Sequence, residues 1–255
     1  MKKDSKSYTV LVAFILCLVC SVFVSAAAVI LKPVQTVNRV ADRQTNILKV
    51  LGLWQPGIDV AAVFDDKVES RIIEIESGDY VEGIDPATFD MYKEQKDASS
   101  NFTLSSAEDI AGIGAVPKHA IVYLQRDEAG TLKTIVLPVQ GYGLWSTMYG
   151  YLALEADGNT VRGITFYQQA ETPGLGGEVE NPNWTALWPG KKVYKDDEVE
   201  LHLVKGGVNP NAADAEYQVD ALAGATLTSR GVTNLIHFWL SDRGFKPYLD
   251  RVAKS

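Results

Sequence analysis

Four β-rich runs decide the fold of this chain: AIVYLQ (120–125), LKTIVLPVQ (132–140), GYLALEAD (150–157) and VRGITFYQQ (161–169). Short runs that are rich in β-branched and aromatic residues are typical of strands. Asp-Gly-Asn at 157–159 separates the last two runs, and it favours a tight hairpin turn because Gly and Asn tolerate positive φ. We therefore predict a set of mainly antiparallel strands.

The segments around these runs give weaker signals. We expect a further strand near residues 198–205, another at 217–219 and a helix over about 229–241. Residues 58–116 mix charged helical stretches with polar linkers and contain no motif that points to a function. This order predicts an α+β domain with a twisted, mainly antiparallel sheet and flanking helices, and not the strand–helix alternation of a Rossmann fold.

A long uncharged segment, Val10–Leu31, stands near the N-terminus. At about 1.5 Å per residue, a helix of this length crosses a hydrocarbon core of about 30 Å. A cleaved signal peptide is the alternative, because basic residues precede the segment and the small residues at 26–28, within it, resemble a cleavage site. Signal cores usually hold about 7–15 apolar residues, whereas this run continues to Leu31, so we favour a single retained transmembrane helix.

The expected organisation is a short N-terminal tail (1–9), a transmembrane anchor (10–31), an amphipathic connector helix (32–57) and a soluble domain (58–255). The connector is predicted from apolar positions that recur at helical spacing between Val37 and Leu51. Lysines and arginines flank the anchor equally on both sides, so charge counting does not give its orientation.

The composition argues against some functions. A formal net charge of −8 opposes a nucleic-acid-binding surface, because such surfaces depend on clustered Lys and Arg. The three histidines, His119, His202 and His237, lack the spacing of metal ligands, so we expect no metal site.

Both cysteines, Cys17 and Cys20, lie in the predicted anchor, so no disulfide connects parts of the soluble domain. Their spacing places the two thiols on one helix face, where they could supply two ligands to an interfacial iron–sulfur cluster if a partner helix supplied the others. Packing between helices is the favoured interpretation, because Cys behaves as a small apolar residue.

Residues 220–229 read DALAGATLTS and predict the end of a strand, a turn of small residues and a helix that begins after Thr228 or Ser229. A helix start offers unpaired N–H groups and the positive end of the helix dipole, and Gly224 lets the backbone approach an anion closely. A plain turn followed by an N-cap is the competing interpretation, and on these physical grounds it is the more common one.

DALAGAT resembles the flavinylation motif of FMN-binding domains, in which an Asp is followed by a small-residue turn that ends in Gly-Ala-Thr. The resemblance implies that Thr226 holds FMN through a phosphoester, which a flavin transferase makes from FAD. It also implies that Asp220 is the leading acid of the motif. Ala223 departs from the many members that have Ser or Thr at this position, and this removes one hydroxyl contact.

The segment ETPGLGGE (171–178) resembles a loop that lies beside the flavin in the same family. Its glycines can take backbone conformations that let the loop lie flat against a planar ring, while Thr172 donates a hydrogen bond. Members often have His shortly before this Glu, whereas this chain has Gln168 and Gln169, so a proton-transfer role at that position is not expected here.

The segment GYGLWSTMYG (141–150) resembles the family's Gly-x-Gly-Leu-Trp stretch. The resemblance implies that Leu144 and Trp145 form a wall of the isoalloxazine site, and core packing of these side chains is the competing interpretation. Three family-like segments in the expected order place an FMN-binding part at about 138–240.

With its N-terminal anchor, the chain is similar to the family of C subunits of bacterial Na+-translocating NADH:quinone oxidoreductases, more than to the G subunits of Rnf complexes. The resemblance implies an electron-transfer protein that carries covalent FMN and has no catalytic residue or metal of its own. The cofactor-binding residues that it implies are Thr226, Asp220, Gly224, Ala225, Leu144, Trp145, Glu171, Thr172, Gly174 and Leu175.

The resemblance also implies the surroundings of the chain. Its partners would be other subunits of the complex, those designated B, D and E especially, and the flavin transferase that matures it. The soluble domain would face the periplasm from the bacterial inner membrane. The rival hypothesis is a membrane-anchored periplasmic module that binds a ligand or partner, or assists assembly, without a redox cofactor.

Overall fold

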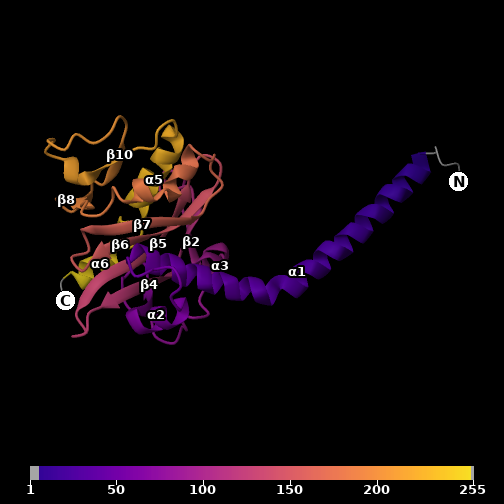
Figure 1. The fold of residues 1–255 in the computed structure, drawn as a ribbon, viewed down its shortest axis with the longest axis horizontal. Coiled ribbons are helices and arrows are strands. Elements are labelled where there is room, and N and C mark those ends of the chain that lie inside the picture. Colours follow the sequence, from indigo (N-terminus) through magenta and orange to yellow (C-terminus); the bar gives the residue numbers. More distant parts are fainter. Residues whose placement is uncertain (1–5, 254–255) are drawn as a thin grey trace. The chain divides into compact units, whose positions relative to one another are not determined.

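The computed structural model describes residues 6–253, which form two compact units that divide between Gln44 and Thr45. The first unit is helical, and the second contains the sheet with its covering helices (Figure 1). The predicted α+β class with one N-terminal apolar helix and a mainly antiparallel sheet is confirmed.

The first helix, α1 (Lys6–Val50), runs through both the predicted anchor and most of the predicted connector. It is long and apolar enough to cross a membrane, and the apolar residues of its first part are exposed to their surroundings. The helix continues through Pro33, although a Pro in a helix interior removes one backbone hydrogen bond. Gly52, with φ of +70°, follows its end.

The centre of the second unit is an antiparallel sheet of five strands in the order β1-β4-β5-β6-β7. Four of the strands match the runs predicted from the sequence. The fifth, β1, lies in the region 58–116 that sequence reasoning left without a strand. Their bounds are β1 Val68–Glu74, β4 His119–Arg126, β5 Leu132–Tyr142, β6 Thr147–Glu155 and β7 Val161–Gln168.

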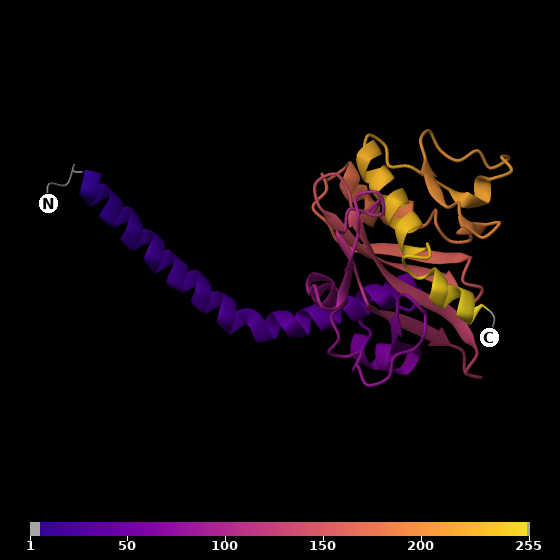
Figure 2. The ribbon, with the colours of Figure 1, turned by 180° about the vertical axis from the view of Figure 1, so that it is seen from behind.

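Each face of the sheet carries its own hydrophobic core, because neighbouring side chains of a strand point to opposite faces. Tyr123 and Tyr151 belong to the core that α2 (Val60–Lys67) and the end of α1 cover. The neighbouring side chains Val122 and Leu152 belong to the larger core on the other face. That core is covered by two helices near the C-terminus, α5 (Thr226–Trp239) and α6 (Lys246–Val252), seen from behind in Figure 2.

Short elements complete the domain. The strand expected at 198–205 is interrupted and forms two separate strands, and the strand expected at 217–219 begins one residue later and pairs in parallel with one of them. The elements are α3 Met91–Lys96, β2 Asn101–Thr103, β3 Ala115–Pro117, η1 Gly176–Glu180, α4 Pro182–Thr185, β8 Tyr194–Lys195, β9 Glu198–Val199, β10 His202–Val204, η2 Ala215–Tyr217 and β11 Gln218–Asp220.

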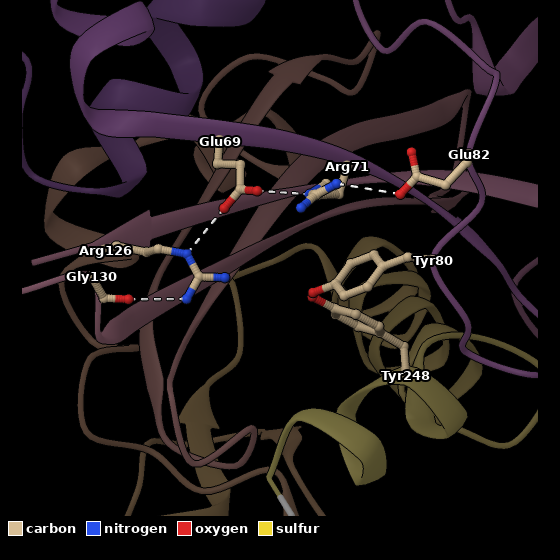
Figure 3. A network of polar contacts seen from close by, with 7 residues as sticks. All are labelled: Glu69, Arg71, Tyr80, Glu82, Arg126, Gly130 and Tyr248. Atoms are coloured by element: carbon tan, nitrogen blue, oxygen red, sulfur yellow. Dashed lines mark hydrogen bonds and ion pairs between the residues drawn. The ribbon is translucent and has the colours of Figure 1, made fainter. Parts of the chain in front are cut away.

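A polar network connects the edge strand β1 with the end of β4 and the turn that follows it (Figure 3). Glu69 accepts hydrogen bonds from Arg71 at 2.7 Å and from Arg126 at 3.0 Å. Nearby, the hydroxyls of Tyr80 and Tyr248 lie 3.0 Å apart and join the turn after β1 to α6. The ion pairs are partly exposed to solvent, so each stabilises the fold by less than about 1 kcal/mol.

Candidate functional site

The motif at 220–226 folds as a sharp turn between β11 and α5. Gly224 has a φ of +72°, and a Cβ at this position would lie 3.0 Å from Leu175 Cδ2, so the turn needs Gly for its conformation and leaves little room for a side chain. Helix α5 begins at Thr226, so the prediction of a start after Thr228 or Ser229 is wrong. Ala225 occupies the N-cap position without a side-chain hydrogen bond.

Ser229 explains the early helix start. Its hydroxyl donates to the carbonyl of Ala225 at 3.0 Å and accepts the N–H of Leu222 at 3.0 Å. These two bonds hold the turn against the first helical residues from inside the helix, in place of a conventional capping side chain. Ser229 is therefore a structural residue of the first turn, and not its N-cap.

Three hydroxyl groups stand in the first turn of α5, and they differ in accessibility. Thr228 and Ser229 are buried, and both hydroxyls are hydrogen-bonded inside the protein. Thr226 is exposed, and its hydroxyl has no hydrogen-bond partner among the described residues. Of the three, Thr226 presents the hydroxyl that a reagent from solution can reach.

The same turn offers hydrogen-bond donors to an anion. The N–H groups of Thr226, Leu227 and Thr228 have no acceptor in the part of the chain that the structure describes. Three such donors at the start of a helix of 14 residues, together with its dipole, favour a phosphate group there.

The loop after β7 carries the most connected carboxylate of this region. Glu171 is only 5% exposed, and its Oε2 accepts the hydroxyl of Thr228 at 2.6 Å. Its carboxylate also accepts the N–H groups of Leu144 at 3.1 Å, Trp145 at 2.9 Å and Ser146 at 3.2 Å. Glu171 therefore joins the three segments that the sequence singled out.

The charge state of Glu171 follows from these contacts. Burial by itself raises the pKa of the carboxyl group, but the hydrogen bonds from Thr228 and from the N–H groups of Trp145, Leu144 and Ser146 outweigh it. The pKa of Glu171 consequently lies below its ordinary value, and the group is a buried anion at neutral pH.

The loop between β5 and β6 is held close to α5. The hydroxyl oxygen of Ser146 accepts the N–H of Ala170 at 2.8 Å, which adds a second tie to the loop that contains Glu171. Gly231 in α5 faces the start of this loop so closely that a Cβ there would lie 2.4 Å from the carbonyl oxygen of Tyr142, the last residue of β5, and 3.0 Å from Gly143 Cα. The backbone of the β5–β6 loop and the first turns of α5 form one packed unit.

Apolar side chains are exposed on the loops of this unit and on the first turn of α5. Trp145 is 65% exposed, and the competing interpretation that it packs in the core is therefore wrong. The segments that carry them are joined through Glu171, so these side chains are candidates for contact with an apolar ligand or a partner. The members of this exposed apolar group are Tyr142, Leu144, Trp145, Leu175 and Leu227.

The other predicted residues lie at different places in the region. Thr172 and Gly174 are exposed in the loop that follows Glu171, and Gly174 has a φ of +74°. The carboxylate of Asp220 accepts the N–H of Val208 at 2.7 Å, while its carbonyl oxygen accepts Trp184 Nε1 at 2.8 Å. Asp220 therefore connects the 206–208 turn to the strand that precedes the motif.

Sequence reasoning missed the roles of Thr228 and Ser146. Both were visible as hydroxyl residues inside the singled-out segments, but their partners lie 57 and 24 positions away. Local spacing carries no signal for such contacts.

Among the described residues, no group of three or more His, Cys, Asp or Glu side chains could hold a metal ion. His119 contacts Glu94 with Nδ1 at 2.8 Å, and His237 contacts the carbonyl oxygen of Leu201. Burial lowers the pKa of His237. The groups that the candidate site offers are a hydroxyl, backbone donors, a buried anion and exposed apolar side chains.

Comparison with known proteins gives consistent matches. A family profile described as "FMN-binding domain" matches residues 143–241. The chain is 48% identical over 256 residues to the C subunit of the Na(+)-translocating NADH-quinone reductase of Pseudomonas aeruginosa, with 99% of this chain and 98% of that protein covered. The protein of the same name from Pasteurella multocida is 44% identical over 256 residues, with 98% and 95% covered.

A solved structure agrees with these matches. The crystal structure of Shewanella oneidensis NqrC has a TM-score of 0.80 and 32% sequence identity to this chain. The alignment covers 86% of this chain and 100% of that one. The similarity therefore extends over the domain that contains all three singled-out segments.

Proposed function

The chain belongs to the family of C subunits of Na(+)-translocating NADH-quinone reductases, and from this membership we propose that it relays electrons through an FMN bonded covalently to Thr226. As a member, it is an FMN-binding electron-transfer component of a membrane oxidoreductase complex. The observation that carries the proposed attachment point is the accessibility of one hydroxyl at the start of α5, that of Thr226.

The proposed bond accounts for the arrangement of the first turn. A flavin transferase would use FAD as donor: the Thr226 Oγ–P bond forms, the pyrophosphate bond of FAD breaks, AMP leaves and the hydroxyl proton is released. Thr228 and Ser229 do not compete as acceptors, because both are buried and hydrogen-bonded. The free N–H groups of the turn would then donate to the phosphate oxygens.

Residues on the neighbouring loops would bind the ring. Leu144, Trp145 and Leu175 present exposed apolar surface, which suits a planar aromatic group. Thr172 is exposed and could donate a hydrogen bond to a polar edge of the ring. Gly174 and Gly224 have no side chain, so a ring can approach their backbone closely.

When bound, the flavin supplies the redox chemistry, and the chain supplies its position, its electrostatic surroundings and its link to the partner proteins. The chain needs no general base or nucleophile for turnover under this proposal. Asp220 orders the turn that leads into the motif, through Val208 and the carbonyl bond to Trp184.

The chain acts as part of a complex, and α1 anchors it in the inner membrane. We extend this to specific partners: the B, D and E subunits would be its closest neighbours, and the soluble domain would face the periplasm. An alkaline phosphatase fused after Ser255 would be active in that orientation. If this fusion is inactive while a reporter that is active only in the cytoplasm is active at the same position, the soluble domain faces the cytoplasm instead.

Colour after denaturation tests the attachment directly. Full-length chain purified in detergent from cells that also express a flavin transferase is expected to keep flavin absorbance after unfolding in guanidinium and removal of small molecules. A colourless protein would instead favour an anchored binding or assembly module, whereas a protein that is yellow until unfolded would carry FMN without the covalent bond.

A further inference from the structure

Glu171 has surroundings that distinguish it from the other carboxylates of the domain. It is nearly fully buried, it accepts four neutral donors, and no Lys or Arg among the described residues pairs with it. A buried charge without a counter-ion is costly unless hydrogen bonds satisfy it, and here three backbone N–H groups and one hydroxyl do so.

Two glycines leave the space that this carboxylate fills. A Cβ on Gly143 would lie 2.6 Å from Glu171 Oε1, and a Cβ on Gly176 would lie 2.8 Å from Oε2 and 2.6 Å from Thr228 Oγ1. Any side chain at either position would displace the carboxylate or the hydroxyl. The backbone therefore leaves room for the Glu171 carboxylate and the Thr228 hydroxyl only because both positions are Gly.

The contacts of Glu171 reach two different parts of the proposed flavin site. Glu171 holds the N–H groups of Leu144 and Trp145, whose side chains project from the same backbone into the exposed apolar group. Through Thr228 it holds the first turn of α5, two residues beyond Thr226. One carboxylate thus fixes both the proposed wall of the ring and the proposed attachment point.

We propose that Glu171, together with Thr228, is a positioning residue that assembles the flavin site before the cofactor arrives. In the same proposal, the negative charge of Glu171 lowers the midpoint potential of the bound flavin. The proposal rests on the proposed function, because it assigns a role within the same site. Glu171 acts through the backbone of Leu144–Ser146 and through the Thr228 hydroxyl, and needs no direct contact with the ring.

The effect on potential follows from electrostatics. A fixed negative charge near a redox group disfavours added electrons, and this effect is strong where the charge is shielded from water. Removing the charge while keeping the hydrogen-bond acceptor should therefore raise the potential. Glu171→Gln does this, because its amide oxygen still accepts backbone N–H groups, whereas Glu171→Ala removes the acceptor as well.

The experiment uses the full chain in detergent, made with and without a flavin transferase, in four forms: wild type, Glu171→Gln, Glu171→Ala and Glu180→Gln. Glu180 is an exposed carboxylate nine residues along the same segment, so its variant controls for loss of one charge. Amide exchange at Leu144–Ser146 in the flavin-free protein reports on preassembly, and a redox titration of the flavin-loaded protein reports on the charge.

We expect Glu171→Ala to raise amide exchange at Leu144–Ser146 at least tenfold and to lower FMN loading severalfold, while Glu171→Gln restores most of the protection and the loading. We expect Glu171→Gln to raise the midpoint potential, and Glu180→Gln to leave it unchanged. Protection in Glu171→Ala equal to wild type, or a Glu171→Gln potential equal to wild type, would overturn the proposal. If wild type carries no FMN, the proposed function fails, and the exchange data alone still decide whether Glu171 positions the loop.

Discussion

The hydroxyl of Thr228 donates a hydrogen bond of 2.6 Å to Oε2 of Glu171, across 57 positions of sequence. This contact joins the first turn of α5 to the loop after β7, and Glu171 in turn holds the N–H groups of the β5–β6 loop. One consequence is that Thr228 is occupied, so Thr226 is left as the accessible hydroxyl of the turn.

Trp145→Ala should change the surroundings of the flavin without changing stability. The side chain is 65% exposed, so its removal should alter the free energy of unfolding by no more than about 0.5 kcal/mol. If Trp145 covers one side of the ring, iodide should quench the flavin fluorescence of the variant about twofold more efficiently. Trp54→Ala, which removes another partly exposed Trp of the same unit, is the control. Equal quenching in wild type and Trp145→Ala would show that this side chain does not cover the ring.

Gly231→Ala should destabilise the domain. Its Cβ would lie 2.4 Å from the Tyr142 carbonyl oxygen, so the helix must move away from the β5–β6 loop. Overpacking of this kind costs about 1–3 kcal/mol, and a domain of this size loses about 2–4 °C in Tm per kcal/mol. Thermal unfolding of the flavin-free protein measures the change.

Arg230→Ala is the matched control for that substitution. Arg230 is the exposed neighbour of Gly231 in the same helix, so its removal should shift Tm by less than about 2 °C. Similar Tm values for Gly231→Ala and wild type would mean that the loop and the helix are not in close contact.

The stability of the domain should depend on pH through Glu171. Its pKa is lowered in the folded protein, so the carboxylate contributes stability that is present above the ordinary Glu pKa of about 4.3 and is lost as pH falls through the folded value. At pH 7, Glu171→Gln should be less stable than wild type by about 1–3 kcal/mol, because weaker hydrogen bonds to a neutral amide replace those to an ionised carboxylate. Denaturant unfolding from pH 7 to pH 3 should show this difference shrinking, and a constant difference would contradict the assignment.

The sequence was sufficient for four of the five strands of the sheet, because the runs rich in β-branched and aromatic residues from β4 to β7 are local signals and the Asp-Gly-Asn turn at 157–159 is distinctive. It did not predict β1, since VESRIIE mixes charged residues with apolar ones whose burial depends on pairing with β4, about fifty positions later. The same limit explains the start of α5. A hydroxyl at Ser229 looks like an N-cap until the contacts of its oxygen with Ala225 and Leu222 are known.

For the candidate site too, some features could be predicted from the sequence and others needed the structure. Resemblance to a family identified the three segments, and the structure brings them together around Glu171. The resemblance singled out Thr226, but the contacts that occupy Thr228 and bury Glu171 could not be predicted, because they join segments far apart in sequence. The resemblance also did not reveal that Asp220 contacts Val208.

Peptide mass spectrometry tests the central claim most directly. The full chain would be purified from cells that express a flavin transferase, as wild type, Thr226→Ala and Thr172→Ala, the last variant removing another exposed hydroxyl of the site. The account predicts an FMN-sized mass increment on the peptide that contains Thr226 in wild type and in Thr172→Ala, and none in Thr226→Ala. An increment that persists in Thr226→Ala, or that maps to another residue of the wild type, would contradict it.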